Sequence, residues 1–204
     1  MTSKEEIHEF GSCPLRSQRD YGERTAGSKS TFNARVDFIL NVLSMFQYGC
    51  VYTDGSCVTD MATIDEKEGR DIWVQSPKEF WNRKTGMCHD ASVFVDAMLR
   101  NEGIEHKCYY IYSDRPPHYP THSFIAALCA DGFKRIVDVF STTTCLYDEK
   151  FTSYMEASEW RLEKWVEYDN GGRQAFMFCG ASMPSPKCGF MEFSENVIKT
   201  FKDV

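Results

Sequence analysis

The sequence predicts an α+β fold, in which helices are segregated from an antiparallel sheet. Two observations lead to this prediction. Helical patterns dominate the first half of the chain, and β-prone segments joined by a hairpin signal follow them. The chain has 204 residues, of which 42% are apolar and 26% charged, as expected for one globular domain. We expect residues 31–204 to form that domain, preceded by an irregular arm over residues 1–30, which are polar and lack periodicity.

The helical elements are expected in the following order. Apolar residues between 36 and 46 recur at i, i+3, i+4 and i+7, which predicts an amphipathic helix. Residues 50–72 contain turn signals and a charged run, typical of a loop or short hairpin. Ser-Pro-Lys-Glu at 76–79 predicts a helix start with a capping box. A further helix is expected from about Met87 to Gly103.

The remaining elements form the predicted sheet and its flanks. Residues 108–112, 121–130 and 133–140 predict strands, because they are rich in aromatic and β-branched side chains. Asp131-Gly132 predicts a hairpin between the second and third of these strands. We then expect a helix over 152–167, a strand over 173–179 and a last helix over 194–202.

Cys88 is the candidate nucleophile. It falls in the first turn of the predicted second helix, where unpaired backbone N–H groups stabilise a thiolate and lower its pKa. Gly86 would let the chain turn tightly and leave room for a substrate. A thiol nucleophile needs a base and the base needs an orienting group, roles that His122 and Asp138 could fill. Taken singly, each of the three residues is more typical of an ordinary structural position.

Whether His122 and Asp138 meet depends on the hairpin register. A two-residue loop would place Asp138 on the sheet face opposite His122. A three-residue loop over 130–132 instead pairs Cys129 with Phe133 and places Asp138 diagonally beside His122 on the same face. We therefore predict the three-residue loop.

The sequence around these residues resembles the transglutaminase-like (papain-like) superfamily. The resemblance covers residues 76–141 and depends on the runs 80–91, 98–104, 121–124 and 137–140. It implies a nucleophile helix packed on an antiparallel sheet, with Cys88, His122 and Asp138 as the triad. Two departures from the family pattern are Ser123 after the histidine and Val139 after the aspartate; neither removes a catalytic atom.

The resemblance implies a cysteine enzyme that transfers an acyl group from a peptide or protein amide, without a cofactor. Peptidase, deamidase and cross-linking outcomes stay open, and so does the alternative of a catalytically inactive binding module on the same fold. Candidate oxyanion or substrate residues are Asn82, Gln75 and Trp81. His89 is expected at the surface or behind the site, because it lies about 100° around the helix from the thiol.

Composition bounds the remaining possibilities. The net charge of −7 gives no basic surface for nucleic acid. No segment is apolar over the roughly 18 residues of a membrane span, and no signal peptide is visible. The nine cysteines, an odd number, indicate free thiols in a reducing cytoplasmic setting. No CxxC pair occurs, so we predict no metal site, although a zinc protein with Cys and His ligands stays a minor alternative. The oligomeric state is left open.

Overall fold

The computed structural model describes residues 39, 43, 45–59, 72–113, 121–138, 145–146, 149–168 and 175–204. The predicted arm over residues 1–30 lies outside these residues. Of the helix predicted over 36–46, Ile39 and Leu43 are helical and buried, but the chain has left the helix by Met45. The described residues form the predicted α+β fold. That residues 31–204 form a single domain stays a prediction.

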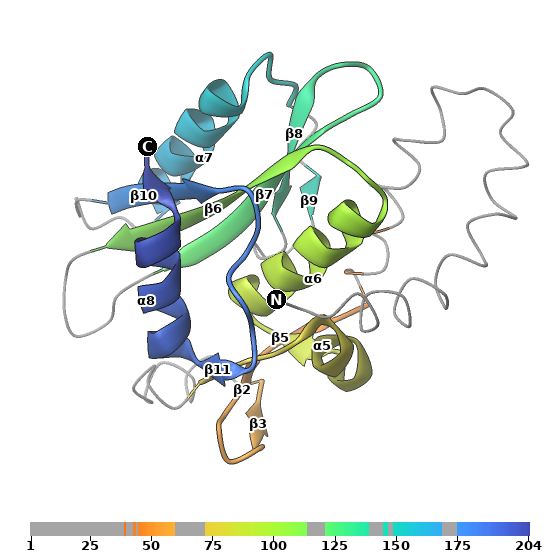
Figure 1. Cartoon of the computed structure of the whole chain (residues 1–204), viewed down its shortest axis with the longest axis vertical. Helices are drawn as coiled ribbons and strands as arrows, with labels where there is room; N and C mark the ends of the chain where they lie inside the picture. Colours follow the sequence, from red (N-terminus) through yellow and green to blue (C-terminus); the bar gives the residue numbers. More distant parts are fainter. Residues whose placement is uncertain are drawn as a thin grey trace, which may run out of the picture.

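The main sheet has six strands and is antiparallel throughout (Figure 1). In spatial order its strands are β12 (Lys202–Asp203), β10 (Ala175–Gly180), β6 (His106–Ser113), β7 (His122–Leu128), β8 (Lys134–Asp138) and β9 (Cys145–Leu146). Strands β6, β7 and β8 are those predicted from residues 108–140. Their side chains alternate between two hydrophobic clusters, so the sheet is buried on both faces.

Helices cover both faces of this sheet (Figure 1). The helices are α5 (Pro77–Arg83), α6 (Cys88–Asn101), α7 (Tyr154–Tyr168) and α8 (Phe190–Thr200). Helices α6 and α8 pack on one face with Ile125 and Val137, and α7 packs on the other face with Phe124 and Ile136. The helix predicted over 194–202 is α8, and it begins earlier, at Phe190. None of the helices in the described part of the chain has the length and apolar character needed to cross a membrane.

Hydrogen bonds fix the starts of α5 and α6, the helix that begins at Cys88. The predicted capping box is present, since the Ser76 side chain accepts from the N–H of Glu79 and the Glu79 carboxylate accepts from Ser76. Helix α6 begins at Cys88 itself, and Asp90 fixes this start. Its two carboxylate oxygens accept from the backbone N–H groups of Met87, at 2.8 Å, and Gln75, at 2.7 Å. The start of α6 is therefore joined to the segment before α5.

Short strand pairs support the same region. They are β1 (Gln47–Tyr48) with β5 (Thr85–Gly86), β2 (Cys50–Val51) with β3 (Cys57–Val58), and β4 (Trp73–Val74) with β11 (Cys188–Gly189). Only the hairpin of β2 and β3 was expected. The room predicted beside Gly86 is not available to a substrate: a Cβ there would lie 2.5 Å from the Phe80 ring. Gly86 therefore serves the packing of α5 against the start of α6.

Candidate active site

The β7–β8 hairpin has the predicted register. The backbone N–H of Cys129 donates to the carbonyl of Phe133 at 2.8 Å, which leaves Ala130, Asp131 and Gly132 as the loop. Gly132 has a φ of 85°, the left-handed conformation expected at the third position of this loop. Ile125 lies opposite Val137, so the same register continues toward the end that contains His122 and Asp138.

His122 and Asp138 meet on the face covered by α7. Nε2 of His122 lies 2.7 Å from Oδ2 of Asp138, and the two residues are only 3% and 1% exposed. Burial alone would raise the pKa of the Asp138 carboxyl, but the positive charges of His122 and Arg161 hold it well below its ordinary value. Asp138 is therefore a carboxylate that accepts a hydrogen bond from Nε2–H of His122, which leaves the other ring nitrogen, Nδ1, for a further partner.

That partner is the Cys88 thiol. His122 is the first residue of β7, and the start of β7 lies beside the start of α6 (Figure 1). The His122 imidazole lies close enough to Cys88 to lower the pKa of its thiol, although α6 and the His122–Asp138 pair belong to opposite faces of the sheet. The contact is possible because both residues lie at the end of their elements. The Cys88 thiol therefore interacts with the imidazole of His122, which in turn is hydrogen-bonded to Asp138.

The electrostatics favour a thiolate–imidazolium pair. Burial opposes charge on Cys88, but hydrogen bonds and positive charge from His122 and His89 bring the pKa of the thiol well below its ordinary value. Burial also opposes charge on His122, yet the Asp138 carboxylate and the thiolate raise the pKa of His122 to about 9. Near neutral pH the proton therefore lies on nitrogen and the negative charge on sulfur.

Helix α7 contributes two residues that the sequence did not reveal. Nε of Arg161 lies 2.5 Å from Oδ2 of Asp138, and its Nη2 lies 3.0 Å from Nε2 of His122. Because Nε2–H already donates to Asp138, the second distance brings two cationic groups together on one carboxylate oxygen. Trp165 stacks on the His122 ring at 5.0 Å between centroids and an angle of 7°. Both contacts restrict the imidazole to the orientation that faces Cys88.

Of the two positions expected for His89, the surface is wrong, and the position behind the site agrees with its burial. The residue is 2% exposed, and its ring lies 5.1 Å from that of Phe190 and 6.1 Å from that of Phe193, both in α8. The negative charge of Asp90, and after it that of the Cys88 thiolate, raises the pKa of His89 against the opposing effect of burial. The 100° rotation between neighbouring helix residues did not keep the His89 ring away from the Cys88 thiol, because α8 encloses the imidazole beside the thiol.

The three candidate oxyanion or substrate residues lie apart from this chain of contacts. Asn82 is exposed on α5. Gln75 is fully buried, and its amide nitrogen donates to the Thr85 carbonyl at 2.9 Å. Trp81 stacks on Phe94 with the rings at 8° to one another. Their roles toward a substrate stay predictions, and their observed contacts are structural.

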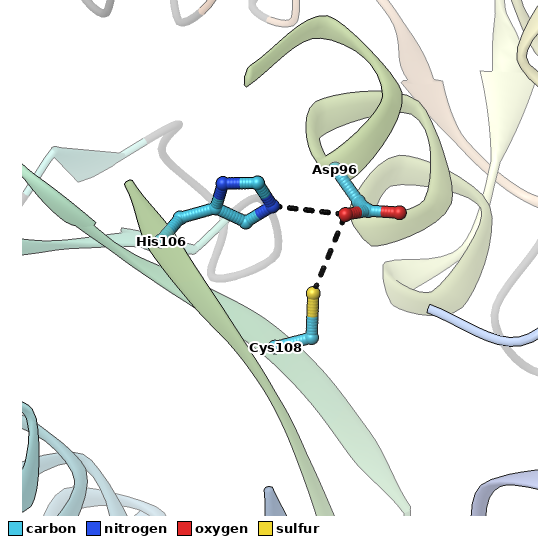
Figure 2. Close-up of side chains that lie close together, drawn as sticks. All are labelled: Asp96, His106 and Cys108. Atoms are coloured by element: carbon cyan, nitrogen blue, oxygen red, sulfur yellow. Dashed lines mark hydrogen bonds and ion pairs between the residues drawn. The ribbon is translucent and has the colours of Figure 1, made fainter. Parts of the chain in front are cut away.

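A second cluster of the same three residue types lies further along α6. Figure 2 shows Asp96 of α6 between His106 and Cys108 of β6. Here the carboxylate occupies the centre, with Nε2 of His106 at 2.9 Å and Sγ of Cys108 at 3.7 Å from the same oxygen, Oδ1. Burial and the neighbouring carboxylate raise the pKa of Cys108 well above its ordinary value. This thiol is therefore no nucleophile, and Cys88 is distinguished by facing imidazoles instead.

The absence of CxxC pairs from the sequence gave no indication of this cluster. His106 and Cys108 are separated by one residue, and alternate residues of a strand share a face. That spacing was the available signal. Asp96, which completes the group, comes from another element and has no signal of its own in the sequence.

Comparison with known proteins gave structural likenesses but no match in sequence. No family model matches the chain, and no curated protein does. The chain resembles calcium-bound LapG from Legionella pneumophila. The match covers 91% of this chain and 97% of LapG, at 11% sequence identity and a TM-score of 0.40. A likeness this distant identifies neither an activity nor site residues, so both must be inferred from the chain's own geometry.

Proposed function

We propose that this protein is a cysteine enzyme that transfers the acyl group of a peptide or protein amide through a thioester on Cys88. The observation that supports this most strongly is the buried His122–Asp138 hydrogen bond beside Cys88, where the pKa of the thiol is lowered and that of the imidazole is raised to about 9. The resemblance of residues 76–141 to transglutaminase-like domains agrees with it.

The residues then have defined roles. The Cys88 thiolate attacks the amide carbonyl carbon, and the backbone N–H groups of the first turn of α6 stabilise the oxyanion. The His122 imidazolium gives its proton to the leaving amine as the C–N bond breaks, leaving a thioester and a neutral imidazole. The same imidazole then accepts a proton from water or from an acceptor amine, which attacks the thioester and releases Cys88. Asp138 holds the imidazole in position and stays ionised throughout.

A second candidate, a binding module without catalysis, is favoured by the burial of Cys88. Only 7% of this residue is exposed. A thiol that substrate cannot reach would keep its geometry and have no turnover.

One experiment separates the two candidates. The protein is treated at pH 6.5 with limiting iodoacetamide, and each cysteine is followed by mass spectrometry. An enzyme should alkylate Cys88 before its other eight cysteines. An electrophilic acyl probe should then label the wild type and fail to label Cys88→Ala. Equal labelling of the two proteins, or late alkylation of Cys88, would exclude the enzyme.

A further inference from the structure

The atoms of the Asp96–His106–Cys108 cluster that face outward are already bound by the protein. Nδ1 of His106 lies 2.7 Å from the backbone carbonyl of Ile104, to which it donates. Oδ2 of Asp96 accepts from the backbone N–H of Met183 at 3.2 Å and from Arg100 at 3.0 Å. Histidine and carboxylate ligands of metal ions are commonly held in this way by backbone and charged groups behind them. Three atoms remain, and they face one another.

These three atoms are all electron-pair donors. With Nδ1–H donating to a carbonyl, Nε2 of a neutral His106 presents its lone pair to Oδ1 of Asp96 at 2.9 Å, and Sγ of Cys108 approaches the same oxygen at 3.7 Å. The ligand atoms lie within 4.8 Å of one another. Such an arrangement needs positive charge at its centre. Two protons can supply this positive charge, one on the ring and one on the sulfur. A single dication can supply it once both protons have left.

We propose that Asp96, His106 and Cys108 form a binding site for Zn²⁺ or a similarly thiophilic divalent ion. Zinc takes thiolate, imidazole and carboxylate ligands at about 2.0–2.3 Å, which in a tetrahedron separates nitrogen from oxygen by about 3.3 Å and sulfur from oxygen by about 3.5 Å. The observed separations of 2.9 and 3.7 Å differ from these values by a few tenths of an ångström, within the reach of small side-chain rotations. Water completes the fourth position.

The charges and protons balance. A thiolate and a carboxylate neutralise the dication, while His106 contributes a neutral nitrogen. Any proton between Nε2 of His106 and Asp96 leaves together with the proton of the Cys108 thiol, and both pass to the buffer. No bond between heavy atoms of the protein changes and no electron is transferred.

The position of the site gives the ion a structural task. Asp96 lies on α6, the helix that begins with Cys88, whereas His106 and Cys108 belong to β6 at the middle of the sheet. Met183, bonded to the same carboxylate, belongs to the segment between β10 and β11. A bound ion would join these three parts and hold the helix on the sheet. The proposal does not depend on the activity of Cys88.

Cobalt binding tests the site with a direct signature for sulfur. The full-length Cys88→Ala protein is used, because a reactive thiolate at position 88 could bind metal by itself. After removal of metal with a chelator, titration with Co²⁺ should reach one equivalent, with a thiolate-to-cobalt charge-transfer band and the intense visible bands of tetrahedral cobalt. Replacing Cys108 by serine in this background should abolish the charge-transfer band. The matched control, Cys179→Ser, changes a cysteine on the opposite face of the same sheet and should keep it.

Two outcomes would overturn the proposal. One is cobalt binding that is absent, or unchanged by Cys108→Ser, in protein that circular dichroism shows to be folded. The other is a spectroscopic result on protein that retains Cys108, which is needed if the serine variant does not fold. In this protein, zinc-edge X-ray absorption should show one sulfur ligand besides nitrogen and oxygen. A shell without sulfur would exclude the site.

Discussion

The charge of Asp138 should control the reactivity of Cys88, and Asp138→Asn isolates that charge. Asparagine preserves the size of the side chain but removes the anion that accepts from His122 at 2.7 Å. Without it, the pKa of His122 should fall from about 9 to its ordinary value of 6.5 or below, because burial lowers it further. Arg161 would then remain beside the imidazole with no carboxylate between them, which disfavours the imidazolium again.

The size of the effect follows from the pKa values. A fall from about 9 to 6.5 is 9 − 6.5, or 2.5 units, equivalent to about 3 kcal/mol. The ratio of the thiolate–imidazolium pair to the neutral pair changes by the same amount, roughly 300-fold. Alkylation of Cys88 at pH 7 should therefore slow at least tenfold, and by less than the full change in this ratio, because His89 and the helix start still stabilise the thiolate.

The assay is the rate of carboxamidomethylation of Cys88 between pH 5 and 9.5, followed by mass spectrometry of its peptide. Asp131→Asn is the matched control, since it makes the same chemical change in the loop of the same hairpin, where Asp131 pairs with Arg135. This control should alkylate Cys88 at the wild-type rate. A folded Asp138→Asn protein that reacts as fast as the wild type at pH 7 would show that this carboxylate does not set the state of the imidazole, and the triad would be refuted.

Three further predictions concern the residues around the thiol. In His89→Asn the rise of the Cys88 alkylation profile should move to higher pH, since one of two stabilising imidazoles is lost; an unmoved profile would rule out this role. In Cys88→Ala the free energy of unfolding should fall from pH 6.5 upward, by up to about 1.4 kcal/mol per unit, because the pKa of His122 stays raised in the folded state. The free energy of unfolding of the wild type should depend less on pH between 7 and 8, because its folding moves one proton from sulfur to nitrogen and takes up none in total. Urea titrations that give the same dependence of this free energy on pH for both proteins would contradict the prediction. Gly86→Ala should lower stability by about 1–3 kcal/mol, because the new Cβ meets the Phe80 ring; an unchanged urea midpoint would disprove the close packing.

The features that could be predicted from the sequence are those that local chemistry decides. The capping box at Ser76 needs only four consecutive residues, and the helix start at Cys88 follows from the turn before it. The register that unites His122 with Asp138 depends on the number of residues in one loop, because a strand alternates its faces with every residue. The contact between His122 and Asp138 could thus be predicted from a glycine at position 132.

The features that were missed depend on packing between distant elements. Arg161 and Trp165 reach His122 only because α7 lies on that face of the sheet, and the periodicity of α7 gives no indication of which face it covers. The surface alternative for His89 failed for a similar reason. Its angle on an isolated helix is correct, but α8 closes over it and turns a surface position into a buried one beside the thiol.

The two Cys–His–Asp clusters of this chain show why residue type alone does not identify a nucleophile. Both lie on α6 and its neighbouring strands, and both are buried apart from the half-buried His106. In the first, an imidazole stands between the sulfur and the carboxylate, so the proton can move to nitrogen and the thiolate is stabilised. In the second, the carboxylate stands between the other two, so a thiolate would face an anion and Cys108 keeps its proton unless a cation replaces it. The order of the three groups therefore decides between a nucleophile and a candidate metal ligand, and that order is fixed by the register of the strands and the rotation of the helix.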